Sequence, residues 1–275
     1  MDISRIDPAE LTAIDVVVEA LTSLADIDPN NIMVVGAQCR NILHSAHGHT
    51  FPLRSTGDID VGIALSDWST YTDLIGRLTR IGHSGIRYLV EGIPVDLLPF
   101  GDVEDPTGTD TPAQRKAALS VFAFREVFER ALILPVGANL KVRIPSPAGY
   151  TALKMHAWCQ RSIDFDDRDA PDLATAAFWY QESTEVADRL YTTKEGQQLL
   201  EATGWNLSHA SAKLLSRDIT AEIGLARTSE LKEAWSKTDV DYLATRFGTE
   251  ILPHWPDNRG ERGLIVDCLG SAILI

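Results

Sequence analysis

The sequence contains little cysteine and no long apolar run. Only three cysteines occur among 275 residues, and none belongs to a Cys-x-x-Cys pair. This argues against a disulfide framework or a zinc site and favours a reducing, cytoplasmic location. No stretch approaches the roughly 18–20 apolar residues that a membrane-spanning helix requires, and the N-terminus lacks the basic start and apolar run of a signal peptide. We therefore expect no membrane partner.

Positive charge is also scarce. The chain has 25 Lys and Arg residues against 39 Asp and Glu residues, and its formal net charge is −14. The acids are not confined to a tail, because residues 1–140 carry 10 basic and 19 acidic groups and residues 141–275 carry 15 and 20. Such a protein is a poor generic binder of nucleic acid or anionic membrane. Either its partner is a cation or a metal, or a local basic patch lies within an acidic whole.

The hydrophobic pattern changes near Pro145–Pro147. Before this point, short apolar runs bounded by glycine alternate with helical periodicity, and after it only helical periodicity remains. The first part predicts helices over 8–26, 37–46 and 68–80, strands over 31–36, 58–65, 86–90, 93–98, 130–134 and 140–144, and a tight hairpin at Glu91-Gly92. The second part predicts helices over 147–160, 169–181, 184–191, 194–202, 208–226, 229–247 and 260–272. We therefore predict an α+β chain with an α/β domain over 1–145 and a helical domain over 146–275.

Three carboxylates stand out by their placement. Strand alternation puts Asp58 and Asp60 on one face, with Ile59 and Val61 directed to the core. Asp96 interrupts an otherwise apolar strand, where a lone carboxylate is costly unless it faces solvent, pairs or binds metal. Together the three residue types suit Mg²⁺ or Mn²⁺, although each taken alone is more typical of a solvated strand end.

A strand that ends at Gly36-Ala37 and leads into a helix is the second feature. Glycine at a strand end lets backbone N–H groups and a helix N-terminus approach a phosphate closely. A single pair of small residues is also common in plain turns.

The order of these features resembles the nucleotidyltransferase superfamily. It runs from Gly36-Ala37 through Asp58-x-Asp60 to Asp96, and Asp58 lies 22 positions after Gly36. That spacing and the flanking residues look like the AbiEii-type toxins and their mycobacterial MenT relatives. The resemblance implies a polymerase-β-like domain with a mixed sheet, followed by a helical domain that completes the active-site cleft. Two departures stand in the pattern: Ala37 replaces the usual Ser, and Asn41 replaces the usual Asp.

The resemblance covers about residues 30–180 and implies further site residues. The segment Pro147–Lys154 resembles the motif whose lysine contacts nucleotide phosphates, and Lys154 is a suitable point charge for them. Arg168–Leu173 resembles a Lys-Asp-x-x-Asp-Leu motif, so Asp169 and Asp172 would orient Lys154, assist a base or merely face water. Nucleotide binding is assigned to Gly36, Ala37, Arg40, Arg54, Thr56 and Lys154.

Alternative roles exist for several of these residues. Arg40 and Arg54 could salt-bridge the acidic residues instead of binding phosphate, and Thr56 could cap a turn. His44, His47 and His49 suggest a metal site, but no carboxylate is interleaved among them, so we interpret them as exposed loop histidines.

The function implied is transfer of a nucleoside monophosphate from an NTP, with the tRNA 3′ end as acceptor, blocked translation and a cognate antitoxin protein. Local basic residues around Arg125/Arg130 and Lys141/Arg143 would then have to serve the RNA. A small-molecule nucleotidyltransferase of the aminoglycoside or lincosamide type is the rival, and the acidity favours a cationic acceptor. A nucleotide-binding or partner-binding relative without turnover is the third possibility.

Overall fold

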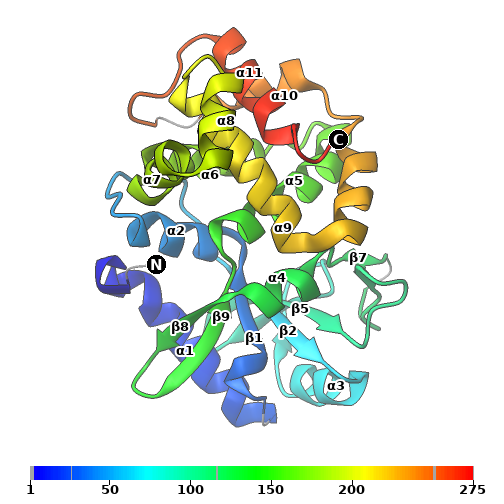
Figure 1. Ribbon diagram of the computed structural model, residues 1–275. Helices are drawn as coiled ribbons and strands as arrows, with labels where there is room; N and C mark the ends of the chain where they lie inside the picture. Colours follow the sequence, from blue (N-terminus) through cyan, green and yellow to red (C-terminus); the bar gives the residue numbers. More distant parts are fainter. Residues whose placement is uncertain (1–2, 26, 116, 250–251, 275) are drawn as a thin grey trace. The chain divides into compact units, whose positions relative to one another are not determined.

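The computed structural model describes residues 3–25, 27–115, 117–249 and 252–274. The protein is α+β and contains a mixed sheet. The chain divides into two compact units, Met1–Ser146 and Pro147–Ile275, and each is described by itself. Figure 1 shows the sheet and its helices in blue to green and the helical second unit in green to red.

The first unit is built on a seven-stranded sheet with the order β3-β4-β5-β2-β1-β9-β8. The central strands β2 and β5 are parallel, as are β1 and β9, whereas β1–β2, β4–β5, β3–β4 and β8–β9 are antiparallel. The bounds are β1 Ile32–Val35, β2 Ile59–Leu65, β3 Thr79–Arg80, β4 Arg87–Val90, β5 Ile93–Gly101, β8 Leu132–Val136 and β9 Leu140–Ile144. A separate ribbon pairs β6 (Thr109–Asp110) with β7 (Leu119–Ser120).

The helices of this unit follow from local signals. Helix α1 (Pro8–Ala25) begins beside Asp7, whose side chain accepts a hydrogen bond from the Ala9 backbone at 2.9 Å, as an N-terminal cap does. The hairpin at Glu91-Gly92 is confirmed, since both residues have positive φ (48° and 81°) and join β4 to β5, as a type I′ turn requires. The remaining helices are α2 Gly36–Ala46, α3 Trp68–Gly76 and α4 Phe124–Arg130.

Two parts of the predicted pattern differ in this unit. The helix predicted over 68–80 ends at Gly76, and its last residues form β3, because Thr79 and Arg80 pair with β4. Helix α4 and the β6–β7 ribbon lack a clear period and were not predicted. Residue 26, the predicted end of the first helix, lies outside the described residues.

The second unit consists of helices α5 Pro147–Arg161, α6 Ala170–Glu182, α7 Thr184–Thr192, α8 Lys194–Ala202, α9 Leu207–Trp235, α10 Val240–Arg246 and α11 Arg259–Gly270. The prediction of helices over 208–226 and 229–247 is wrong in its boundaries. Gly224 has φ 72° and kinks α9 internally, and the chain leaves helical structure only after Trp235. No helix among the described residues is long and apolar enough to span a membrane.

A buried acid lies in the β6–β7 ribbon. Asp110 is fully buried, and among the described residues neither of its carboxylate oxygens has a hydrogen-bond partner. Burial, together with the nearby Glu104 carboxylate, raises the pKa of Asp110 to about 7, although Arg115 acts in the opposite direction. The folded protein therefore keeps the proton up to about pH 7, while the unfolded chain releases it near its ordinary pKa of 3.8. Stability from this group is thus present at low pH and lost as the pH rises from about 4 to about 7.

Replacing Asp110 with Asn should stabilise the protein, because the amide has no charge to bury. The advantage of Asp110→Asn should grow by about 2 kcal/mol between pH 5.5 and pH 8.5, measured by urea denaturation. Asp67→Asn is the control. Hydrogen bonds from Ser69 lower the pKa of Asp67, so its effect should be flat over this range. If the change in unfolding free energy caused by Asp110→Asn were equally independent of pH, the raised pKa of Asp110 would be contradicted.

Candidate functional site

Charged side chains form a row across β4, β5 and β2 of the first unit. Val35 of β1 pairs with Asp60 of β2, Asp60 pairs with Asp96 of β5, and Asp96 pairs with Arg87 of β4. Directly paired residues of neighbouring strands point to the same face of a sheet. Asp58 precedes Asp60 by two residues and shares this face.

The opposite face of the same strands is apolar. Ile59 and Val61 are buried in β2, and Val95 is buried in β5. A shift of one residue in register would exchange the acids with these core residues. The apolar face therefore fixes where the carboxylates lie.

Arg87 joins two of the three predicted metal ligands. Its Nε and Nη2 atoms donate to Asp96 Oδ1 and Oδ2, each at 2.7 Å, and Nη2 also donates to Asp58 Oδ2. The hydrogen bond to Asp96 raises the pKa of the Arg87 guanidinium, and the charges of Asp96, Asp58 and Asp60 add to this against the effect of burial. Arg87 is thus the cation that joins Asp58 to Asp96.

Asp60 lies against the turn between β1 and α2. Gly36, the first residue of α2, has φ +64°, and a Cβ built on it would overlap the Asp60 carboxylate. Glycine is therefore required at position 36 by both the backbone conformation and the contact. Ala37 occupies the first turn of the same helix, where the backbone N–H groups of a helix face outward along its axis.

Arg40 is buried and holds the loop before β2. Its side chain is 1% exposed and donates to the backbone carbonyl of Arg54 and to Asn41 Oδ1. Asn41 in turn donates to Glu10 Oε2 at 3.4 Å, so a carboxylate from α1 lies beside the position at which the family pattern has an acid. These contacts give Arg40 a structural role, while Arg54 is exposed.

Thr56 orients Asp58. Its hydroxyl donates to Asp58 Oδ1 at 2.6 Å, which matches the turn-capping alternative. Thr56 also lines a cavity of about 790 Å³ in the first unit, together with Glu10, Gln38, Asn41 and His49. A cavity of this size can hold a small molecule.

The prediction of exposed loop histidines is wrong for His44. This side chain is 4% exposed, and its Nε2 lies 3.1 Å from the Phe51 carbonyl. Burial and the neighbouring His49 lower its pKa to about 4, and burial and His49 likewise lower the pKa of His47 to about 4. His44 lies on the buried side of α2, within the predicted helix rather than in a loop. These rings are therefore neutral packing groups at pH 7.

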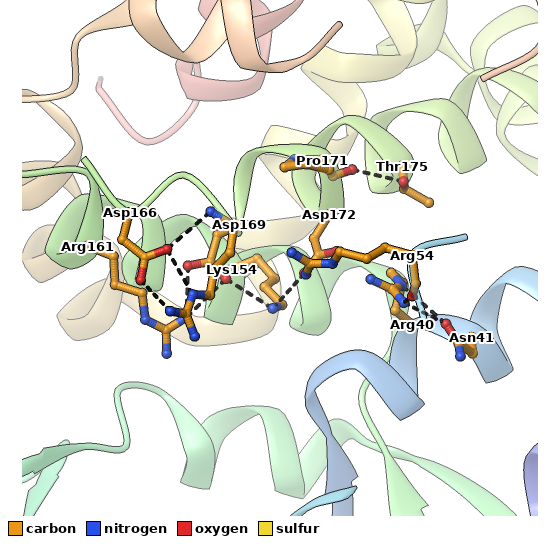
Figure 2. Close-up of polar contacts among 11 residues, drawn as sticks. Arg40, Asn41, Arg54, Lys154, Arg161, Asp166, Asp169, Pro171, Asp172 and Thr175 are labelled. Atoms are coloured by element: carbon orange, nitrogen blue, oxygen red, sulfur yellow. Dashed lines mark hydrogen bonds and ion pairs between the residues drawn. The ribbon is translucent and has the colours of Figure 1, made fainter. Parts of the chain in front are cut away.

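The second unit holds its own ionic cluster, which we call the Lys154 cluster (Lys154, Arg161, Asp169 and Asp172). Figure 2 shows Lys154 of α5 reaching Asp169 and Asp172 at the start of α6, with Nζ–Oδ distances of 3.0 and 2.7 Å. Arg161 also pairs with Asp169 at 2.8 Å. Asp169 is 0% and Asp172 1% exposed, so these acids do not merely face water, and they orient Lys154.

The charge state of Lys154 depends on these partners. Burial alone would lower its pKa, but the carboxylates of Asp172 and Asp169 outweigh burial, and its pKa is raised. Lys154 therefore remains an ammonium at neutral pH. Both aspartates also occupy the positive end of α6, where carboxylates are favoured.

The acidic residues of the first unit provide suitable donors for a hard cation. Carboxylate oxygens are what Mg²⁺ and Mn²⁺ prefer. Within the described ranges, however, no group of three or more His, Cys, Asp or Glu side chains is arranged to hold a metal together. The three carboxylates are suitable ligands for Mg²⁺ or Mn²⁺. In this structure the oxygens of Asp58 and Asp96 accept hydrogen bonds from Arg87 instead.

Three contributors to these clusters were not predicted from the sequence. Arg87 lies in β4 and meets Asp96 only through strand pairing, Glu10 reaches Asn41 from a separate helix, and Arg161 lies seven residues after Lys154. The hairpin at Glu91-Gly92 contained one usable signal, because its two-residue turn places Arg87 opposite Asp96.

Gly36→Ala should destabilise the first unit more than the same change at an open position. Gly82→Ala is the matched control, because Gly82 has φ +65° and a Cβ there meets nothing within 4 Å. The control should cost about 1 kcal/mol from backbone strain, and Gly36→Ala at least about 1 kcal/mol more because Asp60 must move. Urea denaturation measures both, and equal costs would show that the Asp60 contact is unimportant.

Lys154→Met should be strongly destabilising, since it leaves two buried carboxylates without the ammonium that joins them. We expect a loss of about 3–5 kcal/mol. The control is Lys237→Met, whose side chain is 72% exposed and lies 3.5 Å from an exposed Glu233, and it should cost less than about 0.5 kcal/mol. Similar denaturation midpoints for the two variants would refute the importance of the Lys154 cluster.

No protein-family model, curated protein or solved structure matches this chain. The functional assignment therefore depends on the chemistry of the residues described above.

Proposed function

We propose that this protein is a metal-dependent nucleotidyltransferase that moves a nucleoside monophosphate from an NTP to a hydroxyl acceptor. One observation carries the proposal: Asp60 and Asp96 are paired on adjacent strands, with Asp58 on the same face and Gly36 against Asp60. Carboxylates on neighbouring strands, beside a glycine turn and a helix start, are the groups that phosphate and a divalent cation require together. The resemblance to AbiEii-type and MenT toxins supports the same chemistry.

In this proposal each residue has a defined task. Asp58, Asp60 and Asp96 hold Mg²⁺ or Mn²⁺, which when bound neutralises charge on the phosphates. Thr56 fixes the rotamer of Asp58 through its 2.6 Å hydrogen bond. The backbone at Gly36 and Ala37 approaches the phosphates, and Arg54 supplies positive charge. Arg40 acts indirectly by holding the backbone of Arg54.

Lys154 is the phosphate ligand proposed in the second unit. Its two aspartate partners keep the ammonium charged and fix its position, so Asp169 and Asp172 are positioning residues. A fixed ammonium provides the compact point charge that a triphosphate needs.

The proposed step is an in-line displacement. The acceptor hydroxyl oxygen forms a bond to the α-phosphorus, and the bond from that phosphorus to the pyrophosphate oxygen breaks. Pyrophosphate leaves with the electron pair, and the hydroxyl proton passes to a carboxylate of the acidic row and then to water.

The acceptor we favour is the tRNA 3′ end, which the resemblance implies together with a cognate antitoxin. The net charge of −14 favours a cationic small molecule as the second candidate. Of the basic residues considered for RNA, Arg125 is paired with Asp102 and Glu104, and Arg143 donates to the Asn30 and Phe128 carbonyls. Arg130 and Lys141 are exposed and are the better candidates.

Asp60→Asn should reduce NMP transfer by at least about 100-fold, since the amide keeps the shape of the side chain but not its charge. Transfer from labelled NTP to total cellular RNA is the measurement. Asp67→Asn, which alters an exposed helix cap, should leave the rate unchanged. Undiminished transfer by Asp60→Asn would refute the assignment of this residue.

The acceptor is identified by the same assay with purified tRNA and with aminoglycosides. An RNA acceptor predicts transfer to tRNA that weakens steeply as salt rises, and a small cationic acceptor predicts the labelled antibiotic instead. Normal NTP binding without transfer to any acceptor would support the relative that lacks turnover.

A further inference from the structure

Arg87 of β4 belongs to none of the sequence motifs described above. It is held in place by its backbone, because β4 pairs with β3 on one side and with β5 on the other. Its side chain remains 36% exposed. The backbone is therefore fixed, while the guanidinium has solvent on one side into which it can turn.

The hydrogen bonds of Arg87 use specific oxygen atoms. Both oxygens of Asp96 and Oδ2 of Asp58 accept from the guanidinium. The contact to Asp96 is bidentate, with two parallel 2.7 Å bonds, which is the strongest arrangement between these groups. An inner-sphere divalent cation would use these same oxygen atoms.

A guanidinium and a divalent cation cannot share these oxygens at no cost. Both are positive, and at close range in a partly dehydrated site they repel each other. The Asp60 carboxylate lies against Gly36 in the same row.

We infer that Arg87 is a positioning residue that competes with the divalent cation for Asp58 and Asp96, and so sets the cation affinity of the site. The inference rests on the proposed function, because it takes the acidic row as the cation site. When an NTP binds, the Arg87 guanidinium can turn to its phosphates, which accept bidentate hydrogen bonds from arginine. Asp58 and Asp96 then become available to the cation, so the site binds the cation weakly until the nucleotide is present.

The test is Mn²⁺ binding to the full chain, measured by electron paramagnetic resonance of free Mn²⁺. Arg87→Met should bind Mn²⁺ at least 10-fold more tightly than the wild type, and Arg87→Lys should fall between them because it keeps the charge but loses the bidentate geometry. Arg77→Met is the matched control: Arg77 pairs with Asp73 on α3 and is 54% exposed, and its loss should leave Mn²⁺ affinity unchanged. Equal or weaker binding by Arg87→Met would overturn the inference.

Thermal denaturation provides the second readout. Without added cation, Arg87→Met should melt below the wild type, because the carboxylates lose their partner, and Mn²⁺ should raise its melting temperature more than that of the wild type. If Arg87→Met does not fold, Arg87→Lys takes its place. It too should bind Mn²⁺ more tightly than the wild type and show a larger Mn²⁺-induced rise in melting temperature. An equal Mn²⁺-induced rise in all proteins would contradict the competition.

The outcomes separate this inference from the proposed function. Tighter Mn²⁺ binding by Arg87→Met without NMP transfer by the wild type would uphold the competition and remove the enzyme assignment. NMP transfer by the wild type, with unchanged Mn²⁺ affinity in Arg87→Met, would support the enzyme assignment and overturn the competition.

Discussion

Mutual repulsion between the carboxylates of β2 and β5 is the constraint on which the candidate site depends. Asp60 and Asp96 are directly paired on parallel strands, about 5 Å apart at the backbone. Two charges at that spacing repel by roughly 3 kcal/mol at an effective dielectric constant near 20. The buried apolar face of the same strands prevents the acids from turning away, so cations must balance them. Arg87 provides one positive charge, and the proposed divalent ion provides the remainder.

The same principle governs the second unit, with a different solution. Asp169 and Asp172 are more deeply buried than Asp58 and Asp96, and they pair with Lys154 and Arg161. The acids Asp58 and Asp96 are partly exposed, whereas Asp169 and Asp172 are buried. Partly exposed carboxylates suit ligand binding, and buried ones suit the positioning of one ammonium. The carboxylates of the two units are thus balanced in different ways.

Sequence reasoning succeeded where the pattern was local. The alternation in Asp58–Val61 placed the acids opposite the core, and Glu91-Gly92 predicted its hairpin. It failed where pairing between distant segments determines the structure. Thr79 and Arg80 were predicted to be helical, but they form a strand that pairs with β4. Arg87 was missed because its partner Asp96 is found only through register, and His44 because its burial depends on a contact with Phe51.

We propose that the acidic row holds a nucleotide through a divalent cation. Equilibrium binding of a non-hydrolysable NTP analogue, with Mg²⁺ and then with a chelator, is the sharpest test. We expect the chelator to weaken binding to the wild-type protein at least about 10-fold, because phosphates and bare carboxylates repel. The same affinity with and without Mg²⁺ would contradict it.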